Sequence, residues 1–260
     1  YQDETKGKEM KKIVGVLSVA FCLMLAGCAS QKQDTIEKRN TDISKDLTYD
    51  HSMELEYAKM FAVDYYQNDY ALVTIADDGK YLIVPEGESV PEDMDKDITV
   101  LQQPIQNIYL AASAAMDMFV ATDALDAVRF SSLKADGWYI EEAKKAMQDG
   151  DIIYAGKYSA PDYEMILNEN CGLAIENTMI LHTPEVKEQM EKFNIPVLVD
   201  HSSYETNPLG RTEWVKLYGM LTGHEDQAEQ AFDAEAKAFE RVSDQDATGK
   251  TVAFFYITTN

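Results

Sequence analysis

Hydrophobic and polar residues alternate between Ala58 and Val84, and a repeat of period two is typical of β-strands. Two turn signals, Asn68-Asp69 and Asp77-Asp78-Gly79, divide this stretch into three apolar runs. Pro85 ends the last run, and an acidic segment from 86 to 97 follows it. The pattern predicts an antiparallel meander of three strands followed by a loop.

From Ile98 onward, short apolar runs alternate with stretches of helical periodicity. Runs of strand length fall at 108–110, 128–130, 152–154, 173–175 and 197–199. Helical stretches fall at 140–147, 162–168 and 184–193, and Ser113 is placed to cap a further helix. Strands that alternate with helices predict a mostly parallel sheet that is buried on both faces.

The alternation stops at residues 204–223, which are helical. Thr206 or Asn207 can serve as the N-cap and Pro208 suits the first turn. Gly223 ends the helix, whose apolar stripe consists of Trp214, Leu217, Tyr218 and Leu221. A second periodic run (Ala228, Phe232, Ala236, Phe239) leads to a turn at Gly249 and a predicted strand over 251–257. One βα domain therefore closes, a helix leads the chain away, and another domain begins.

The first residues have the features of a secretion signal. Met10 precedes two lysines and is the expected initiator, which leaves residues 1–9 as an upstream extension. The apolar run from 13 to 25 is shorter than a membrane span. It ends in Leu25-Ala26-Gly27-Cys28, which resembles the lipobox of bacterial lipoproteins. We expect a lipoprotein signal peptide over 10–27, lipid attachment at Cys28 and a flexible polar tether over 28–45. An ordinary signal peptide with an incidental cysteine is the alternative.

Composition restricts the classes of function. The chain has 46 acidic and 23 basic residues, a net charge of −23, which argues against nucleic acid as a partner because binding it needs clustered Lys and Arg. Of the 3 cysteines, no pair remains to form a bridge after signal cleavage. The motifs of serine hydrolases, zinc proteases, dinucleotide-binding and P-loop enzymes are missing, so we expect no enzyme.

The run Pro208-Leu209-Gly210-Arg211-Thr212-Glu213-Trp214-Val215-Lys216, followed by a long helix, resembles the substrate-binding proteins of ABC importers for ferric siderophores, haem and cobalamin. The resemblance implies an α/β, two-lobed periplasmic-binding-protein-like fold whose lobes are joined by a rigid interlobe helix. It implies an N-terminal lobe over 46–223, the interlobe helix over 224–247 and the start of a C-terminal lobe over 248–260. We expect the N-terminal lobe to be complete and the C-terminal lobe truncated, because a dozen residues cannot form a lobe.

Ligands of open parallel sheets collect at the carboxyl ends of the strands. The segments expected there carry aromatic and cationic side chains suited to a bulky anionic ligand: Trp138, Tyr139, Lys157, Tyr158 and Tyr204. The alternative is that these rings only cover the sheet edge. Arg211 is a further candidate for a ligand carboxylate, and its alternative is an ion pair with Glu205 or Glu213. Trp214 is expected in the core.

Glu164 opens the helix after the segment Ala155 to Pro161. In the resembled family a Glu at this place contacts an Arg of the membrane permease, which implies a docking role for Glu164. Cys171 and Gly172 stand where the family usually has Pro-Asp. The alternative for Glu164 is a helix-start residue favoured by the dipole.

Together these observations predict the extracytoplasmic, lipid-anchored binding component of an ABC importer. It would act as a monomer and deliver a ferric chelate or tetrapyrrole (an iron-siderophore, haem or cobalamin-type ligand) to an ABC permease, without a cofactor. One alternative is a zinc- or manganese-binding lipoprotein, in which His182 and His201 would meet Glu205; His51 and His224 share no ligand spacing with them. Another is a secreted enzyme on a chelatase-like βα scaffold.

Overall fold

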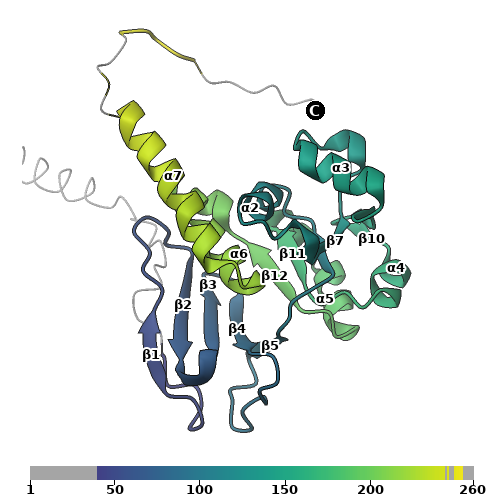
Figure 1. The fold of residues 1–260 in the computed structure, drawn as a ribbon. Coiled ribbons are helices and arrows are strands. Elements are labelled where there is room, and N and C mark those ends of the chain that lie inside the picture. Colours follow the sequence, from purple (N-terminus) through teal and green to yellow (C-terminus); the bar gives the residue numbers. More distant parts are fainter. Residues whose placement is uncertain (1–39, 244, 246–248, 254–260) are drawn as a thin grey trace, which may run out of the picture. The chain divides into compact units, whose positions relative to one another are not determined.

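A first sheet forms the N-terminal part of the fold in the computed structural model, which describes residues 40–243, 245 and 249–253 (Figure 1). Its strands lie in the order β1-β2-β3-β4-β5: Tyr49–Ser52, Phe61–Tyr66, Ala71–Ile75, Gly79–Val84 and Ile98–Gln102. The strands β2, β3 and β4 form the predicted antiparallel meander. The strand β5 pairs with β4 in parallel, so this first strand after the acidic loop belongs to the first sheet.

The second sheet is entirely parallel, as the βα pattern predicted. Its order is β12-β11-β6-β7-β8, and the strands in chain order are β6 Ile108–Leu110, β7 Val128–Ser131, β8 Ile153–Tyr154, β11 Ala174–Asn177 and β12 Val197–Asp200. Alternate residues enter two different cores: Leu110 and Ile175 face one, whereas Tyr109 and Ala174 face the other. Both faces are thus buried.

Short helices connect the strands of the second sheet: α2 Ala115–Ala121, α3 Glu141–Asp149, α4 Tyr163–Asn168 and α5 Pro184–Lys192. A small hairpin, β9 Gly156–Lys157 and β10 Ala160–Pro161, precedes α4. Single 3-10 turns are η1 Gln67–Asp69, η2 Leu125–Ala127, η3 Ala135–Gly137, η4 Thr178–His182 and η5 Ser202–Tyr204. One prediction was wrong in detail. Ser113 does not cap α2, because its backbone carbonyl accepts from Met116 in a preceding turn and the N-cap position falls on Ala114.

The helices α6 Pro208–Thr222 and α7 Glu225–Ser243 pack along each other (Figure 1). The Asn207 side chain caps α6 by accepting from the Leu209 N–H at 2.9 Å, and Gly223 ends it with φ 75°. Trp214 and Leu217 face the main core, while Val215 contacts Ala228 and Phe232 of α7. From Glu213 to Leu221 helix α6 is therefore buried on all sides, between the core and α7.

Two buried carboxylates of the α6 region hold the segment between β1 and β2, residues 53–60. Glu213 accepts backbone N–H groups from Glu56, Tyr57 and Ala58 at 2.9, 2.8 and 2.7 Å. Glu205 accepts from Lys59 and Met60, and also from the Trp214 indole N–H at 3.1 Å. We call residues 56–60 the strap. Both carboxylates are satisfied mainly by backbone donors, which fixes the strap to α6.

The strap approaches the backbone of α6 closely at Gly210, so a small residue is needed there. A Cβ atom added at Gly210 would lie 3.1 Å from the Tyr57 carbonyl oxygen and 3.2 Å from a Glu205 carboxylate oxygen. The run from Pro208 to Trp214 is therefore a docking surface for the strap. Leu209 donates to the cap residue Asn207, Gly210 allows the strap to approach, and Glu213 accepts hydrogen bonds from the strap.

Several predictions fall on residues outside the described ranges: the signal peptide, Cys28, most of the tether and the end of the strand predicted over 251–257. The helix predicted over 224–247 is described from Glu225 to Ser243. Across the described ranges, no helix is both long and apolar enough to cross a membrane.

Candidate functional site

The strand order of the second sheet changes direction at β6. The strands β7 and β8 lie on one side of β6, and β11 and β12 lie on the other. The carboxyl ends of β6 and β11 are neighbours there, and the Asn177 amide donates to the Ala111 carbonyl oxygen at 3.0 Å. Open α/β sheets bind ligands in the crevice at such a switch point. The segments that follow the five strands therefore form the candidate site, which we call the carboxyl edge.

Large apolar side chains are exposed on three of these segments. Tyr139, after β7, is 94% exposed, and Tyr204, after β12, is 57% exposed. Met179 and Leu181, in the 3-10 turn after β11, are 48% and 53% exposed. Single exposed apolar residues are ordinary, but a set gathered on the edge of one sheet is typical of a binding surface.

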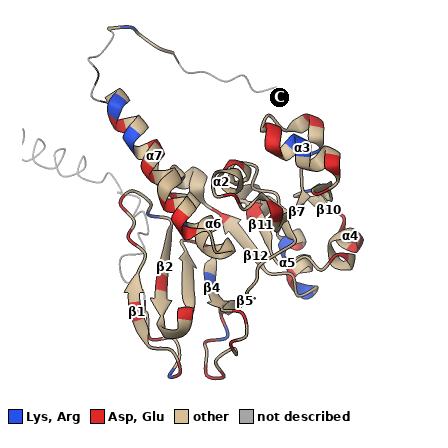
Figure 2. Ribbon diagram, viewed as in Figure 1, with Lys and Arg blue, Asp and Glu red and all other residues tan. Residues whose placement is uncertain are grey.

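The carboxyl edge is also less acidic than the rest of the chain. Its segments carry the exposed pairs Lys134 with Asp136 and Lys157 with Asp162, so these charges balance, whereas the whole chain has a net charge of −23. Figure 2 shows acidic residues along α7, α3 and α4 instead. The ammonium of Lys134 lies 5.5 Å from the centre of the Tyr154 ring, within reach of a cation–π contact. Exposed aromatic rings beside cations suit an anionic, partly aromatic ligand.

Gly156 shapes the segment that carries Lys157 and Tyr158. Its φ is +83°, and an added Cβ would lie 2.4 Å from the Ala160 carbonyl oxygen, so the hairpin requires glycine here. The Tyr109 hydroxyl donates to the Gly156 carbonyl oxygen at 3.1 Å and ties the hairpin to β6. Lys157 is exposed, while Tyr158 is half-buried and packs against the core under the hairpin.

Trp138 differs from the other predicted ligand residues because its ring is inside the fold. It is 4% exposed, belongs to the main core, and donates from its indole N–H to the Ser131 hydroxyl at 3.0 Å. The neighbouring Tyr139 points outward. Trp138 thus anchors the segment after β7, and a ligand above the edge would meet Tyr139 first.

Arg211 borders a cavity of about 500 Å³ beside the carboxyl edge. Small and polar residues from four parts of the chain line this cavity: Ala114, Asp117, Met118, Ala121, Ser202, Ser203, Arg211, Thr212, Val215, Ala231, Ala234 and Glu235. The Arg211 guanidinium donates to the backbone carbonyl of Ser203 at 3.0 Å and to that of Glu205 at 3.4 Å. Within the described part of the chain it forms no ion pair with Glu205 or Glu213, since their carboxylates bind the strap.

Glu176 is a buried acidic residue beside the carboxyl edge that the sequence analysis does not single out. It lies in β11 with no exposed surface, and neither carboxyl oxygen has a hydrogen-bond partner among the described atoms. Burial raises the pKa of Glu176 to about 8. The only available signal was an acidic residue inside an otherwise apolar strand, directly before the switch-point residue Asn177.

Glu164 is exposed in the first turn of α4. Asp162 supplies the N-cap, because its carboxylate accepts from the Met165 N–H at 3.1 Å. Cap formation therefore does not require Glu164, whose carboxylate is accessible to a partner.

The histidines do not gather around one point. His182 is exposed, whereas His201 is 4% exposed, its Nε2 has no partner in the described structure, and burial lowers its pKa. Glu205, the third residue of the predicted metal set, is occupied by the strap. No group of three His, Cys, Asp or Glu residues suited to a metal ion occurs among the residues with described positions.

No protein-family profile matches the chain. Two lipoproteins of Methanocaldococcus jannaschii are similar in sequence. Uncharacterized lipoprotein MJ0878 is 24% identical over 255 residues, covering 86% of this chain and 60% of the relative, and uncharacterized lipoprotein MJ0872 is 20% identical over 221 residues, covering 81% and 55%. The chain thus spans somewhat more than half the length of these relatives.

Three solved structures with partial similarity are the following. Holo-ViuP has a TM-score of 0.42 and 20% identity, over 55% of this chain and 46% of that chain. Staphylococcus aureus SirA complexed with staphyloferrin B has a TM-score of 0.37 and 20% identity, over 53% of this chain and 42% of that chain. The siderophore-binding protein BauB, bound to two acinetobactin molecules and ferric iron, has a TM-score of 0.43 and 16% identity, over 53% of this chain and 46% of that chain.

Proposed function

We propose that this chain is the lipid-anchored, extracytoplasmic binding component of an ABC importer and that its carboxyl edge binds an anionic iron chelate or tetrapyrrole. The observation that carries the proposal is the edge itself, where the exposed side chains of Tyr139, Tyr204 and Lys157 lie on segments that follow strands of one sheet in a strongly acidic protein. Arg211 adjoins the last of these segments through its bond to the Ser203 carbonyl. Flat rings would stack on the tyrosines, and the cations would pair with ligand carboxylates or phenolates.

The rest of the chain has consistent roles under this proposal. Cys28 carries the lipid anchor, which agrees with the naming of both sequence relatives as lipoproteins. Glu164 forms a salt bridge with a basic permease residue, for which its exposed position on α4 is suitable. Binding, and not covalent chemistry, is the activity, and the protein acts as a monomer.

Helix α7 is the proposed connection to a second lobe. Its apolar stripe begins at Ala228 and Phe232, which are buried against α6. The stripe continues at Phe239 and Val242, which are 43% and 68% exposed. Residues 46–223 would form the first lobe, 224–247 the interlobe helix, and 248 onward the second lobe.

Titration of the protein with ferric siderophores, haem, cobalamin and divalent metals, followed by tryptophan fluorescence, tests the proposal. Trp138 lies directly beside Tyr139, so an absorbing chelate at the edge is expected to quench its emission. Tyr139→Ala, Tyr204→Ala and Lys157→Ala should each weaken binding by about tenfold. Lys145→Ala, an exposed lysine on α3, is the matched control and should bind like wild type. A response to metals alone, or to none of the compounds, would overturn the proposal.

A further inference from the structure

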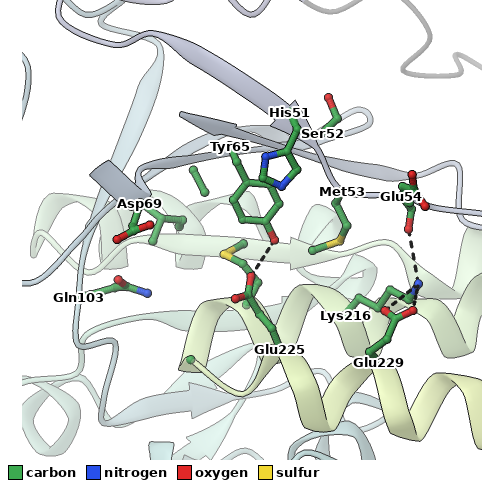
Figure 3. Close-up of a pocket in the computed structure, with 14 residues that line it drawn as sticks. His51, Ser52, Met53, Glu54, Tyr65, Asp69, Gln103, Lys216, Glu225 and Glu229 are labelled. Atoms are coloured by element: carbon green, nitrogen blue, oxygen red, sulfur yellow. Dashed lines mark hydrogen bonds and ion pairs between the residues drawn. The ribbon is translucent and has the colours of Figure 1, made fainter. Parts of the chain in front are cut away.

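A second cavity, of about 750 Å³, lies between the first sheet and the helices α6 and α7. Residues of β1 and β2 and the segment after β1 line one side, and α6 with the start of α7 lines the other (Figure 3). The lining residues are His51, Ser52, Met53, Glu54, Tyr65, Asp69, Ala71, Ile83, Gln103, Lys216, Met220, Gly223, Glu225 and Glu229. Its lining from α6 and α7 shares no residue with that of the carboxyl-edge cavity, which is lined by Arg211, Thr212 and Val215 of α6.

The single lysine of this cavity is already fully engaged. The Lys216 ammonium lies 3.1 Å from Glu229, 3.6 Å from Glu213 and 3.4 Å from the backbone carbonyl of Glu54. It also lies 4.6 Å from the centre of the Phe232 ring. An anionic ligand would have to compete with these carboxylates for Lys216, so this cavity does not suit the ligand class proposed for the carboxyl edge.

Three further carboxylates line the cavity without a basic partner among the residues whose positions are described: Glu54, Asp69 and Glu225. They are not clustered. Figure 3 shows Asp69 at one end, Glu54 at the other and Glu225 between them. Met53 lies between these charges, and Ala71, Ile83 and Met220 add further apolar surface.

A stacked pair of aromatic rings lies in the middle of the cavity. The His51 imidazole stacks on the Tyr65 ring with centroids 4.7 Å apart and an interplanar angle of 15°. The Tyr65 hydroxyl donates to Glu225 at 2.7 Å, and burial together with this bond raises the pKa of Tyr65. Tyr65 therefore stays a donor and holds the Glu225 carboxylate in one position.

We propose that this cavity binds a small organic polycation of the linear polyamine class. Such a molecule has ammonium groups separated by methylene segments, which matches carboxylates separated by apolar surface. The ammonium groups would pair with Asp69, Glu225 and Glu54, and the methylene segments would lie on Met53, Ile83 and Met220. This site is independent of the function proposed for the carboxyl edge.

Calorimetric titration of the whole protein with spermidine and 1,4-diaminobutane, at physiological ionic strength, tests the site. We expect saturable binding at one site. Butylamine, which has the same carbon chain as the diamine but one ammonium, should bind about tenfold more weakly than the diamine, because it cannot pair with two carboxylates.

Two substitutions localise the binding. Glu225→Gln keeps an acceptor for Tyr65 and should weaken spermidine binding by about tenfold. Asp69→Asn suits a residue whose φ is 62° and should weaken spermidine binding while leaving butylamine unchanged. Glu235→Gln, with the same charge change on α7 but in the other cavity, is the control.

Three results would overturn the proposal: no saturable binding of either polyamine, equal binding of butylamine and the diamine, or equal weakening by Glu225→Gln and Glu235→Gln. The last two would mean that the negative charge of the whole protein attracts any cation. Unchanged binding of an anionic chelate to Glu225→Gln would show that the two sites are separate.

Discussion

The carboxylate of Glu213 accepts the backbone N–H of Ala58 at 2.7 Å, joining two residues that are 155 positions apart in the chain. Both residues are buried, with 0% of Glu213 and 4% of Ala58 exposed. With the bonds from Glu56 and Tyr57, one side chain satisfies three successive backbone donors. Strap and helix therefore depend on each other.

Replacing Glu213 with Ala should lower the free energy of unfolding by about 3 kcal/mol, because the buried N–H of Ala58 and the partly buried N–H groups of Glu56 and Tyr57 lose their acceptor. Urea unfolding monitored by circular dichroism measures the change. Glu235→Ala, an exposed glutamate of α7, should cost less than about 0.5 kcal/mol. A loss at Glu213 as small as that at Glu235 would mean that the strap contributes little to stability.

Gly210→Ala should be destabilising by up to about 1 kcal/mol, since pressing the new methyl group on the Tyr57 carbonyl and the Glu205 carboxylate outweighs the gain in helix propensity from alanine. Gly137→Ala is the matched control, because its added Cβ would meet only the Leu133 Cβ, at 3.7 Å. Thermal unfolding of both variants compares them. Equal melting temperatures would show that the strap can shift to accommodate the methyl group.

Gly156 and Gly150 offer a similar pair for the carboxyl edge. Both have positive φ, +83° and +87°, but only at Gly156 would an added Cβ meet backbone atoms. Both alanine variants should lose about 1 kcal/mol to backbone strain. Only Gly156→Ala should also displace Lys157 and weaken chelate binding, by severalfold in the fluorescence titration. Equal affinities of the two variants would contradict a role for the hairpin in binding.

Glu176 should make stability depend on pH. Its pKa is raised from 4.5 to about 8 by burial, so the folded protein retains a proton that the unfolded chain has lost. Stability is therefore expected to fall as pH rises from about 4.5 to about 8, by at most about 5 kcal/mol, and to change no further above that range. Glu176→Gln should remove this component from urea unfolding measured across the range.

The control for that experiment is Glu164→Gln, which changes an exposed carboxylate of α4. It should follow the wild-type pH profile. If Glu176→Gln also followed the wild-type profile, the carboxyl group of Glu176 would have to be hydrated or paired in solution.

The sequence allowed most elements to be predicted, because strands such as 197–199 and caps such as Asn207 and Gly223 have local signals. Contacts between distant segments have no such signal. The sequence suggests Glu205 or Glu213 as an ion-pair partner of Arg211, because they are close in the chain, whereas the structure pairs both carboxylates with the strap.

The sequence also does not predict which side chains of the carboxyl edge point outward. The adjacent aromatics Trp138 and Tyr139 have the same propensity for a binding site, yet one is 4% and the other 94% exposed. Trp138 packs in the main core and donates its indole N–H to Ser131, seven residues earlier, whereas Tyr139 has no place in that core. The burial of Glu176 was hidden for the same reason, because it depends on the elements packed over β11.

The strap also has a consequence for how the protein is made. A chain synthesised from its N-terminus presents residues 56–60 long before Glu205 and Glu213, and at about 5–20 residues per second the delay is about 7 to 30 s. During that time the five amides of the strap have no native acceptor. The first sheet can pair its strands early, but its attachment to α6 through the strap has to wait until α6 has emerged.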